Sequence, residues 1–479
     1  MTTTRFTSRA EPGQPAADAP RVHVVTFGCQ MNKYDSELAE GRFRAKGYVT
    51  TPQLDDADVV LFNTCSVREH AEERTYSWLG EIKRAKEARP ELVIGVMGCM
   101  AQRVEEEVFR RAGHVDLVVG TREFQRLPEL VDEVRARRSD PLIGGARDRR
   151  VLATDGGVTV EVDRSDEVYT GGRHAYLAVM RGCDLSCTYC IVPTTRGRVQ
   201  SRPIDSLVQE ARWLVSQGVQ VLTLLGQTVN SYGEDFPAPG AGEARHRGRQ
   251  GRPSLADLLY ALQEIDGLER IRLVTLHPSY VTPLFAESIR DCDKVDRFLP
   301  LPAQAGSDSI LRAMKRGYTL DLYRERLAIL REAVPDIELG SDWIVGFPGE
   351  TDADFEGSLE FLAEVGFVVN YVFKYDPRPT TRAADRLPDE IPVEVKKERN
   401  QRLLAQGARV ALGRLSGWIG RETSAFLEEV SDRRPGTLIG RTHHGLTISV
   451  AGGEELLGRS VRVRVGDATA YGLSGELLG

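Results

Sequence analysis

The sequence predicts an α/β protein with three folded parts: an N-terminal α/β domain on a parallel sheet, a central partial (β/α)6 barrel and a small C-terminal all-β barrel. Short β-branched runs alternate with segments of 3.6-residue periodicity in two separate blocks, which is typical of βαβ units on parallel sheets. After Ser416 five short alternating runs separated by glycines take over, as in a small β-barrel. A chain of 479 residues has room for two or three such domains.

The composition is that of a globular protein outside the membrane, with 41% hydrophobic and 28% charged residues. No apolar run approaches the ~18 residues that cross a bilayer, and residues 1–20 lack the apolar stretch of a secretory signal. We therefore expect a cytoplasmic protein without a membrane partner, beginning with a disordered tail over residues 1–20. The net charge of −7 does not favour nucleic acid, but arginine-rich stretches at 196–202 and 245–252 allow local RNA contacts.

Three cysteines of the N-terminal domain each follow a predicted strand. HVVTFG leads into Cys29, DVVLFNT into Cys65 and LVIGVMG into Cys99, and a helical stretch comes after each. Right-handed crossovers bring the carboxyl ends of such strands to one edge, where open α/β sheets bind ligands. We expect the three thiols to converge there, and organised thiols in a reducing compartment favour metal binding or catalysis over disulfides. The alternative is that they are small buried core residues.

The remaining domain boundaries follow from composition and periodicity. The N-terminal domain is expected over residues 21–138, and the Gly-, Asp- and Arg-rich segment 139–168 is interpreted as a linker. Six β/α units, fewer than the eight of a closed barrel, are expected over 169–412 and leave an open side for a bulky substrate. Residues 237–253 interrupt that pattern and are expected to form an exposed, mobile insertion. The terminal barrel is expected over 416–479.

The most specific local pattern is Cys183-x-x-x-Cys187-x-x-Cys190, directly after the strand AYLAVMRG. Three thiolates within eight residues can hold three irons of a cubane cluster and leave the fourth iron available to a small molecule. Structural zinc is the alternative, but zinc requires four ligands, and no adjacent Cys or His completes the set.

Other residues are expected just past strand ends on the same face of the barrel, where glycine admits a ligand to the backbone and Gln, Asn or Ser supplies hydrogen bonds. They are Gly226, Gln227, Asn230, Gln304, Ser307 and Gly346.

The CxxxCxxC loop after the first barrel strand resembles the radical S-adenosylmethionine superfamily. The resemblance implies that its three cysteines hold a [4Fe–4S] cluster whose open iron binds S-adenosylmethionine. It also implies that one electron from the cluster cleaves the C–S bond and gives a 5′-deoxyadenosyl radical. Roles in S-adenosylmethionine binding are implied for Tyr189, Gly226, Gln227, Gln304, Ser307 and Gly346.

From about residue 21 to residue 477 the chain is similar to the methylthiotransferase family of radical S-adenosylmethionine enzymes. The matching segments are TFGCQMNKYDSE, FNTCSVRE and GVMGCMAQ, and the terminal barrel resembles the RNA-binding module TRAM. The resemblance implies that Cys29, Cys65 and Cys99 hold a second, auxiliary [4Fe–4S] cluster. GCQMN and CTYCIVPTTRGRVQSRP are most similar to the branch that converts N6-isopentenyladenosine at tRNA position 37, 3′ of the anticodon, to its 2-methylthio derivative.

The same resemblance implies three partners: the anticodon stem-loop of tRNA, an external one-electron reductant and a sulfur donor. Two alternatives keep the enzyme class, with threonylcarbamoyladenosine in tRNA or an aspartate of a ribosomal protein as the methylthiolated group. A third alternative is a non-catalytic RNA-binding protein with structural metal sites.

Overall fold

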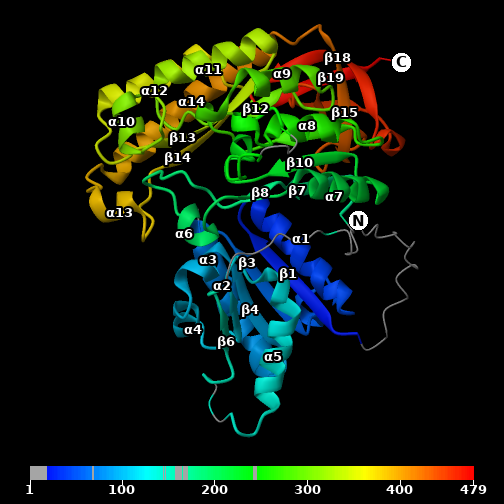
Figure 1. Cartoon of the computed structure of the whole chain (residues 1–479), viewed down its shortest axis with the longest axis vertical. Helices are drawn as coiled ribbons and strands as arrows, with labels where there is room; N and C mark the ends of the chain where they lie inside the picture. Colours follow the sequence, from blue (N-terminus) through cyan, green and yellow to red (C-terminus); the bar gives the residue numbers. More distant parts are fainter. Residues whose placement is uncertain are drawn as a thin grey trace. The chain divides into compact units, whose positions relative to one another are not determined.

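The structure is a computed structural model that describes residues 19–66, 69–143, 145, 147–156, 164, 171–240 and 245–478. The tail expected over residues 1–20 therefore lies almost entirely outside the described residues. The chain forms two compact units, residues 1–169 and residues 170–479 (Figure 1). Among the described residues, no helix combines the length and the apolarity needed to span a membrane.

The first unit is built on a six-stranded sheet in the order β2-β1-β3-β4-β5-β6, in which every neighbouring pair is parallel. This confirms the parallel α/β fold expected for the N-terminal part. The strands are β1 (Arg21–Phe27), β2 (Val49–Thr50), β3 (Val59–Thr64), β4 (Val93–Gly98), β5 (Leu117–Val119) and β6 (Val151–Ala153). Strand β6 lies within segment 139–168, so the segment interpreted as a linker contributes an edge strand to the sheet.

Helices cover both faces of this sheet. Phe43 of α1 and Leu130 of α5 belong to the core on one face, together with Leu61 of β3. Leu79 of α2 belongs to the core on the other face, together with Phe62 of β3. Successive strand residues thus point to opposite cores, which is why β3 and β4 are apolar without alternation. The helices are α1 (Gln30–Ala45), α2 (Glu69–Ala88), α3 (Cys99–Val104), α4 (Glu107–Arg111) and α5 (Leu127–Ser139), with short 3₁₀ turns η1 (Leu54–Asp56) and η2 (Phe124–Arg126).

The second unit contains two three-stranded parallel sheets, β7-β10-β11 and β12-β13-β14. A parallel bridge from Ile271 to Val295 joins them in chain order. The six strands confirm the partial (β/α)6 barrel. They are β7 (His174–Ala178), β10 (Val221–Leu225), β11 (Arg270–Leu273), β12 (Phe298–Pro300), β13 (Glu338–Val345) and β14 (Val369–Lys374).

Local sequence signals define several of the barrel helices. Ser254 and Asp257 form a capping box at the start of α8, and Thr351 and Asp354 form another at α12. Gly366 ends α12 in the left-handed conformation that favours glycine. The helices are α6 (Val192–Arg196), α7 (Ile204–Ser216), α8 (Leu255–Gln263), α9 (Pro283–Asp291), α10 (Asp308–Ala313), α11 (Leu320–Ala333), α12 (Asp352–Val365), α13 (Arg382–Arg386) and α14 (Val393–Ser416), with 3₁₀ turns η3 (Val229–Ser231), η4 (Arg249–Gly251) and η5 (Pro278–Tyr280).

The run AYLAVMRG, expected as one strand, divides into two. Strand β7 ends at Ala178, and β8 (Met180–Arg181) leaves the barrel sheet to pair antiparallel with β9 (Gln200–Ser201). This pairing closes the base of the intervening loop, which carries the three clustered cysteines.

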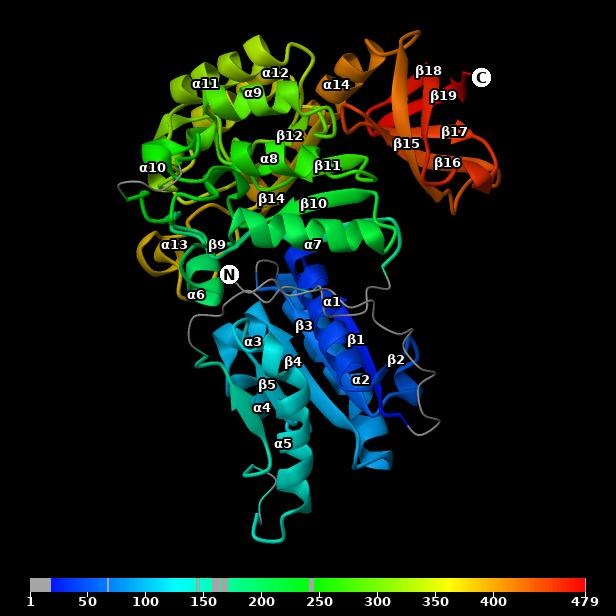
Figure 2. The ribbon, with the colours of Figure 1, turned by 45° about the vertical axis from the view of Figure 1, so that its right-hand side comes forward.

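The C-terminal strands form a closed barrel in the order β15-β16-β17-β19-β18, which confirms the expected all-β part (Figure 2). The barrel packs on the central barrel through polar contacts: Arg272 with Glu428, and His444 Nε2 with Asp336 Oδ2 at 2.7 Å. The elements are β15 (Glu422–Val430), β16 (Thr437–Thr442), β17 (Thr447–Ala451), β18 (Ser460–Thr469), β19 (Gly472–Leu477) and the 3₁₀ turn η6 (Glu454–Leu456).

Candidate cluster sites

The structure places the first cysteine trio at the carboxyl ends of three adjacent strands. Phe27 of β1 pairs with Thr64 of β3, and Thr64 pairs with Gly98 of β4. Cys65 and Cys99 come directly after the last two of these residues, and Cys29 caps the start of α1. The backbone N–H of Cys65 donates to the carbonyl of Phe27 at 3.0 Å. Cys29 is exposed, whereas Cys65 and Cys99 are buried.

A buried amide pair joins the turn at Cys29 to strand β3. Asn32 Nδ2 donates to Asn63 Oδ1 at 2.9 Å, and Asn63 Nδ2 donates to the carbonyl of Asn32 at 2.8 Å and to Ser36 Oγ at 2.9 Å. The Cys29 thiol donates to Asn32 Oδ1 at 3.2 Å. Both asparagines are fully buried, so these bonds hold the first cysteine turn against the strand that leads to Cys65. Sequence reasoning missed this pair, although both asparagines stand within the quoted cysteine motifs.

A second polar cluster joins the segments after Cys65 and Cys99. Arg103 of α3 donates through Nε to Ser66 Oγ at 2.8 Å and through Nη2 to Glu72 Oε2 at 2.6 Å, and Ser66 Oγ donates to Glu72 Oε1 at 2.8 Å. These hydrogen bonds link helix α3, which begins at Cys99, to the segment that follows Cys65.

Gly98, directly before Cys99, requires the glycine backbone. Its φ is +101°, and an added Cβ would lie 2.5 Å from Asn63 Oδ1 and 2.8 Å from the carbonyl oxygen of Thr64. We expect Gly98→Ala to destabilise the protein by about 2–5 kcal/mol, from left-handed strain and overpacking together. Gly47→Ala is the matched control: φ is +85° and nothing lies within 4 Å, so it should cost only about 1–2 kcal/mol. Thermal unfolding of both variants checks this, and equal Tm losses would contradict it.

The second trio lies on the loop between β8 and α6. Gly182 precedes it with φ +69°, and an added Cβ would meet the carbonyl oxygen of Arg198 at 2.0 Å. The backbone N–H of Cys183 donates to Gly197 O at 3.1 Å, and that of Val199 donates to Asp184 Oδ1 at 3.1 Å. These contacts fold the loop back on itself. Its three thiols line a single cavity of about 380 Å³, together with Arg198 and the segment 380–382.

Thr188, between the second and third cysteines, anchors the middle of this loop. Its N–H donates to Met314 O at 3.0 Å and its Oγ1 donates to Ala313 O at 2.9 Å. Its carbonyl accepts from the N–H of Ala383 at 2.8 Å. Residues at the ends of α10 and α13, far along the chain, therefore hold the loop from two sides.

Burial controls the protonation of the loop thiols. Loss of solvation raises the pKa of Cys190 to about 12 and also raises the pKa of Cys183, above the ordinary value of a cysteine. Without a metal both are therefore protonated thiols at neutral pH, and a metal that binds them must displace the protons.

Each trio supplies the kind and number of donor atoms, three cysteine sulfurs, that a [4Fe–4S] cluster bound through three cysteines needs. The thiols come from one strand edge or from one short loop, and the loop cysteines line one cavity. In the part of the chain that the structure describes, no group of three or more His, Cys, Asp or Glu side chains is arranged to hold a metal ion. None of the seven cysteines, all within the described residues, forms a disulfide.

The other predicted residues all lie beyond strand ends of the central barrel, on one rim. Tyr189 stands edge-on to Phe347, with ring centroids 6.4 Å apart. The carbonyl of Gly226 accepts from Thr275 Oγ1 at 2.6 Å, and Gln227 beside it is half-buried. Asn230 is not directed at a ligand, because its amide bonds both the N–H and the carbonyl of His277 at 2.9 Å.

The three predicted residues beyond β12 and β13 form hydrogen bonds within the protein. Gln304 is buried with φ +66°, and its N–H donates to Asp342 O at 2.9 Å. Ser307 Oγ donates to Asp354, and the N–H of Gly346 donates to Glu350 Oε2 at 2.6 Å. These bonds brace the rim. The hydroxyl proton of Ser307 and the N–H of Gly346 are already donated within the protein.

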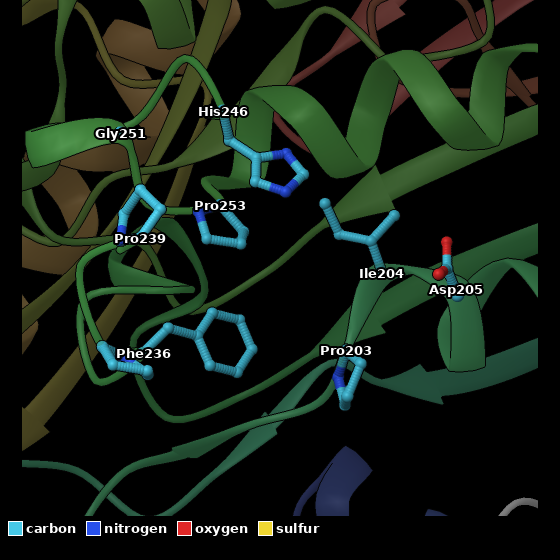
Figure 3. A pocket seen from close by; sticks show the side chains of 9 residues that line it. Pro203, Ile204, Asp205, Phe236, Pro239, His246, Gly251 and Pro253 are labelled. Carbon is cyan, nitrogen blue, oxygen red and sulfur yellow. The ribbon is translucent and has the colours of Figure 1, made fainter. Parts of the chain in front are cut away.

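The insertion 237–253 folds against the start of α7. Phe236, four prolines and His246 line a separate cavity of about 380 Å³ with Ile204, and in Figure 3 the rings of Phe236 and Pro253 face the space beside Ile204. This cavity shares no lining residue with the cysteine cavity. The position of residues 241–244 of the insertion lies outside the described part of the chain.

Three family models match the chain in order. The model described as the uncharacterized protein family UPF0004 matches residues 21–120, the radical SAM superfamily matches 177–362 and the TRAM domain matches 419–478. Among solved structures, the chain resembles the radical S-adenosylmethionine methyltransferase TsrM from Kitasatospora setae, with cobalamin and a [4Fe-4S] cluster bound. The TM-score is 0.56 at 14% identity, over 76% of this chain and 77% of that one, so the likeness concerns the fold.

Curated relatives match almost end to end. The tRNA-2-methylthio-N(6)-dimethylallyladenosine synthase of Moorella thermoacetica is 40% identical over 95% of this chain and 98% of its own. The synthase of the same name from Cereibacter sphaeroides is 41% identical over 97% and 100%, and that of Rhodopirellula baltica is 39% identical over 95% of each chain. The chain belongs to the family of tRNA-2-methylthio-N(6)-dimethylallyladenosine synthases, within the radical S-adenosylmethionine methylthiotransferases.

Proposed function

We propose that this chain converts N6-isopentenyladenosine at position 37 of tRNA to its 2-methylthio derivative, with S-adenosylmethionine as cosubstrate. The observation that carries the proposal is the near-complete match to synthases of that name at about 40% identity. The two cysteine trios support it, because one lies beyond a barrel strand and the other at the edge of the parallel sheet.

Cys183, Cys187 and Cys190 would hold the cluster that binds S-adenosylmethionine, and Cys29, Cys65 and Cys99 would hold the auxiliary cluster. Bound there, the clusters supply one-electron cleavage of S-adenosylmethionine and a site for the sulfur that is transferred. We assign S-adenosylmethionine binding to Tyr189, Gly226, Gln227, Gln304, Ser307 and Gly346, since all six lie on the barrel rim. Ser307 and Gly346 would contribute to the shape of the binding site and not donate hydrogen bonds to S-adenosylmethionine, because their donors already bond Asp354 and Glu350.

The residues of the chain bind and orient rather than carry out the chemistry. Gly182 and Thr188 fix the loop so that its three thiols face one cavity. The loop thiols are half-buried, which would limit the access of water to a reactive species formed beside them.

The partners and parts follow from this function. The anticodon stem-loop of tRNA is the substrate, and an external one-electron reductant and a sulfur donor are required in the cytoplasm, where tRNA is modified. We assign a role to each part of the chain: an auxiliary-cluster domain over 21–138, a connection over 139–168, a catalytic barrel over 169–412 and an RNA-binding barrel over 416–479. The match of the TRAM model to residues 419–478 supports the last assignment.

Mass spectrometry of tRNA nucleosides from a strain that lacks the gene tests the substrate. We expect 2-methylthio-N6-isopentenyladenosine to disappear and its unmethylthiolated precursor to accumulate, because the proposed reaction converts the one into the other. Expression of the intact chain should restore the product. Persistence of that nucleoside, with loss of the threonylcarbamoyl product or of a methylthiolated ribosomal aspartate instead, would overturn the proposal.

A further inference from the structure

Arg316 places a buried positive charge against the middle cysteine of the loop. The residue lies shortly after α10 in the chain and is only 7% exposed. Nη1 donates to Cys187 Sγ at 3.3 Å and to Tyr189 Oη at 3.4 Å, and Nε donates to Tyr318 Oη at 3.4 Å. The guanidinium thus contacts the loop at one thiol and at the neighbouring tyrosine.

No carboxylate among the described residues forms an ion pair with this cation. None of the ion pairs formed among the described residues includes Arg316. Arg399, which is buried to a similar degree, pairs with both Glu350 and Asp352 at 2.7 Å. A guanidinium keeps its charge in proteins, and a buried charge is costly unless an anion faces it. At Arg316 the contacts are instead one cysteine sulfur, Cys187 Sγ, and two phenol oxygens.

Tyr318 fixes the position of the guanidinium by accepting a hydrogen bond from its Nε. Tyr318 Oη lies 3.0 Å from Pro302 O and 2.9 Å from Ala303 O, to which its hydroxyl donates. The hydroxyl therefore turns its lone pairs toward Arg316 Nε. Thr188 is bonded to Met314, two residues before the arginine, so the cysteine loop and Arg316 are held in register.

We propose that Arg316 is a positioning residue that raises the reduction potential of the cluster held by Cys183, Cys187 and Cys190. A thiolate-bound cluster becomes more negative when it takes up an electron, so a nearby cation that donates to a ligand sulfur stabilises the reduced form more than the oxidised form. The arginine thereby favours the one-electron reduction on which cleavage of S-adenosylmethionine depends. This inference rests on the proposed assignment of the three cysteines as cluster ligands.

The test is a redox titration of the full-length, anaerobically reconstituted protein, followed by electron paramagnetic resonance. The signal of the loop cluster is identified as the one that changes when S-adenosylmethionine is added. For Arg316→Gln we expect the ratio of reduced to oxidised cluster at a given potential to fall about tenfold, a shift of about 59 mV to lower potential for a one-electron couple. Arg331→Gln is the matched control, because it removes a half-buried guanidinium whose hydrogen bond goes to the carbonyl of Val365. Its midpoint should equal that of the unmodified protein.

Iron and sulfide content, read together with the midpoint potential, distinguishes failure of the ligand assignment from failure of the role of Arg316. Wild-type protein that holds no cluster sensitive to Cys187→Ala would remove the ligand assignment itself. A full cluster in Arg316→Gln with an unchanged or higher midpoint overturns the role of Arg316 alone. Arg316→Lys provides a second test that does not require the glutamine variant to retain iron. The ammonium keeps the charge but lacks the separate Nη1 and Nε donors with which the guanidinium reaches Cys187, Tyr189 and Tyr318. We therefore expect the ratio of reduced to oxidised cluster to fall by less than tenfold. No downward shift in this variant also overturns the proposal.

Discussion

Replacing Cys183 with alanine abolishes reductive cleavage of S-adenosylmethionine, because the remaining two thiols of the loop cannot retain the cluster that supplies the electron. The change removes one of three ligands from a loop whose geometry Gly182 and Thr188 fix, so only two thiols of the loop remain. We expect iron to fall from about eight to about four atoms per chain, one cubane being lost. Formation of 5′-deoxyadenosine with dithionite as reductant should fall to the background without enzyme.

Cys292→Ala is the matched control for this experiment. Cys292 is fully buried at the end of α9, belongs to neither trio, and burial raises the pKa of its thiol to about 12. The same Cys-to-Ala change there should leave iron content and 5′-deoxyadenosine formation intact. Cleavage that persists in Cys183→Ala at the rate of the Cys292 control would refute the assignment of the loop.

Replacing Cys29 with alanine separates cleavage from transfer. Cys29 is exposed and caps α1 through its backbone, so its loss should not disturb the buried core around Cys65 and Cys99. We expect iron again to fall to about four atoms per chain, this time from the auxiliary site. Cleavage of S-adenosylmethionine should continue within a few-fold of normal, whereas the methylthiolated nucleoside should fall below detection.

Both products are measured in one assay, by chromatography and mass spectrometry of the same reaction with an anticodon stem-loop. Cys183→Ala should lose both products, whereas Cys29→Ala should lose only the methylthiolated nucleoside. Continued cleavage in Cys29→Ala excludes general misfolding of that variant, because misfolding would reduce both products together. A normal yield of methylthiolated nucleoside from Cys29→Ala would remove the auxiliary site from the mechanism.

The sequence predicted much of this architecture because the signals are local. Apolar runs that end in Cys29, Cys65 and Cys99 specify strands, and the helical periodicity after each requires a crossover that returns to the same edge. Sequence reasoning failed where pairing partners are distant: β6 gains its strand identity only from β5, and AYLAVMRG divides because Met180 and Arg181 pair with Gln200 and Ser201.

By itself, the sequence determined which donor atoms are present and where along the chain they stand: six cysteines in two trios, each beyond a strand end. Their surroundings were decided only by the tertiary structure. Arg316 faces Cys187, Asn63 bonds Asn32 beside Cys29, and burial raises the pKa of Cys190 to about 12. Such environments depend on contacts between segments far apart in sequence, and neither periodicity nor spacing records which side chains those contacts bring together.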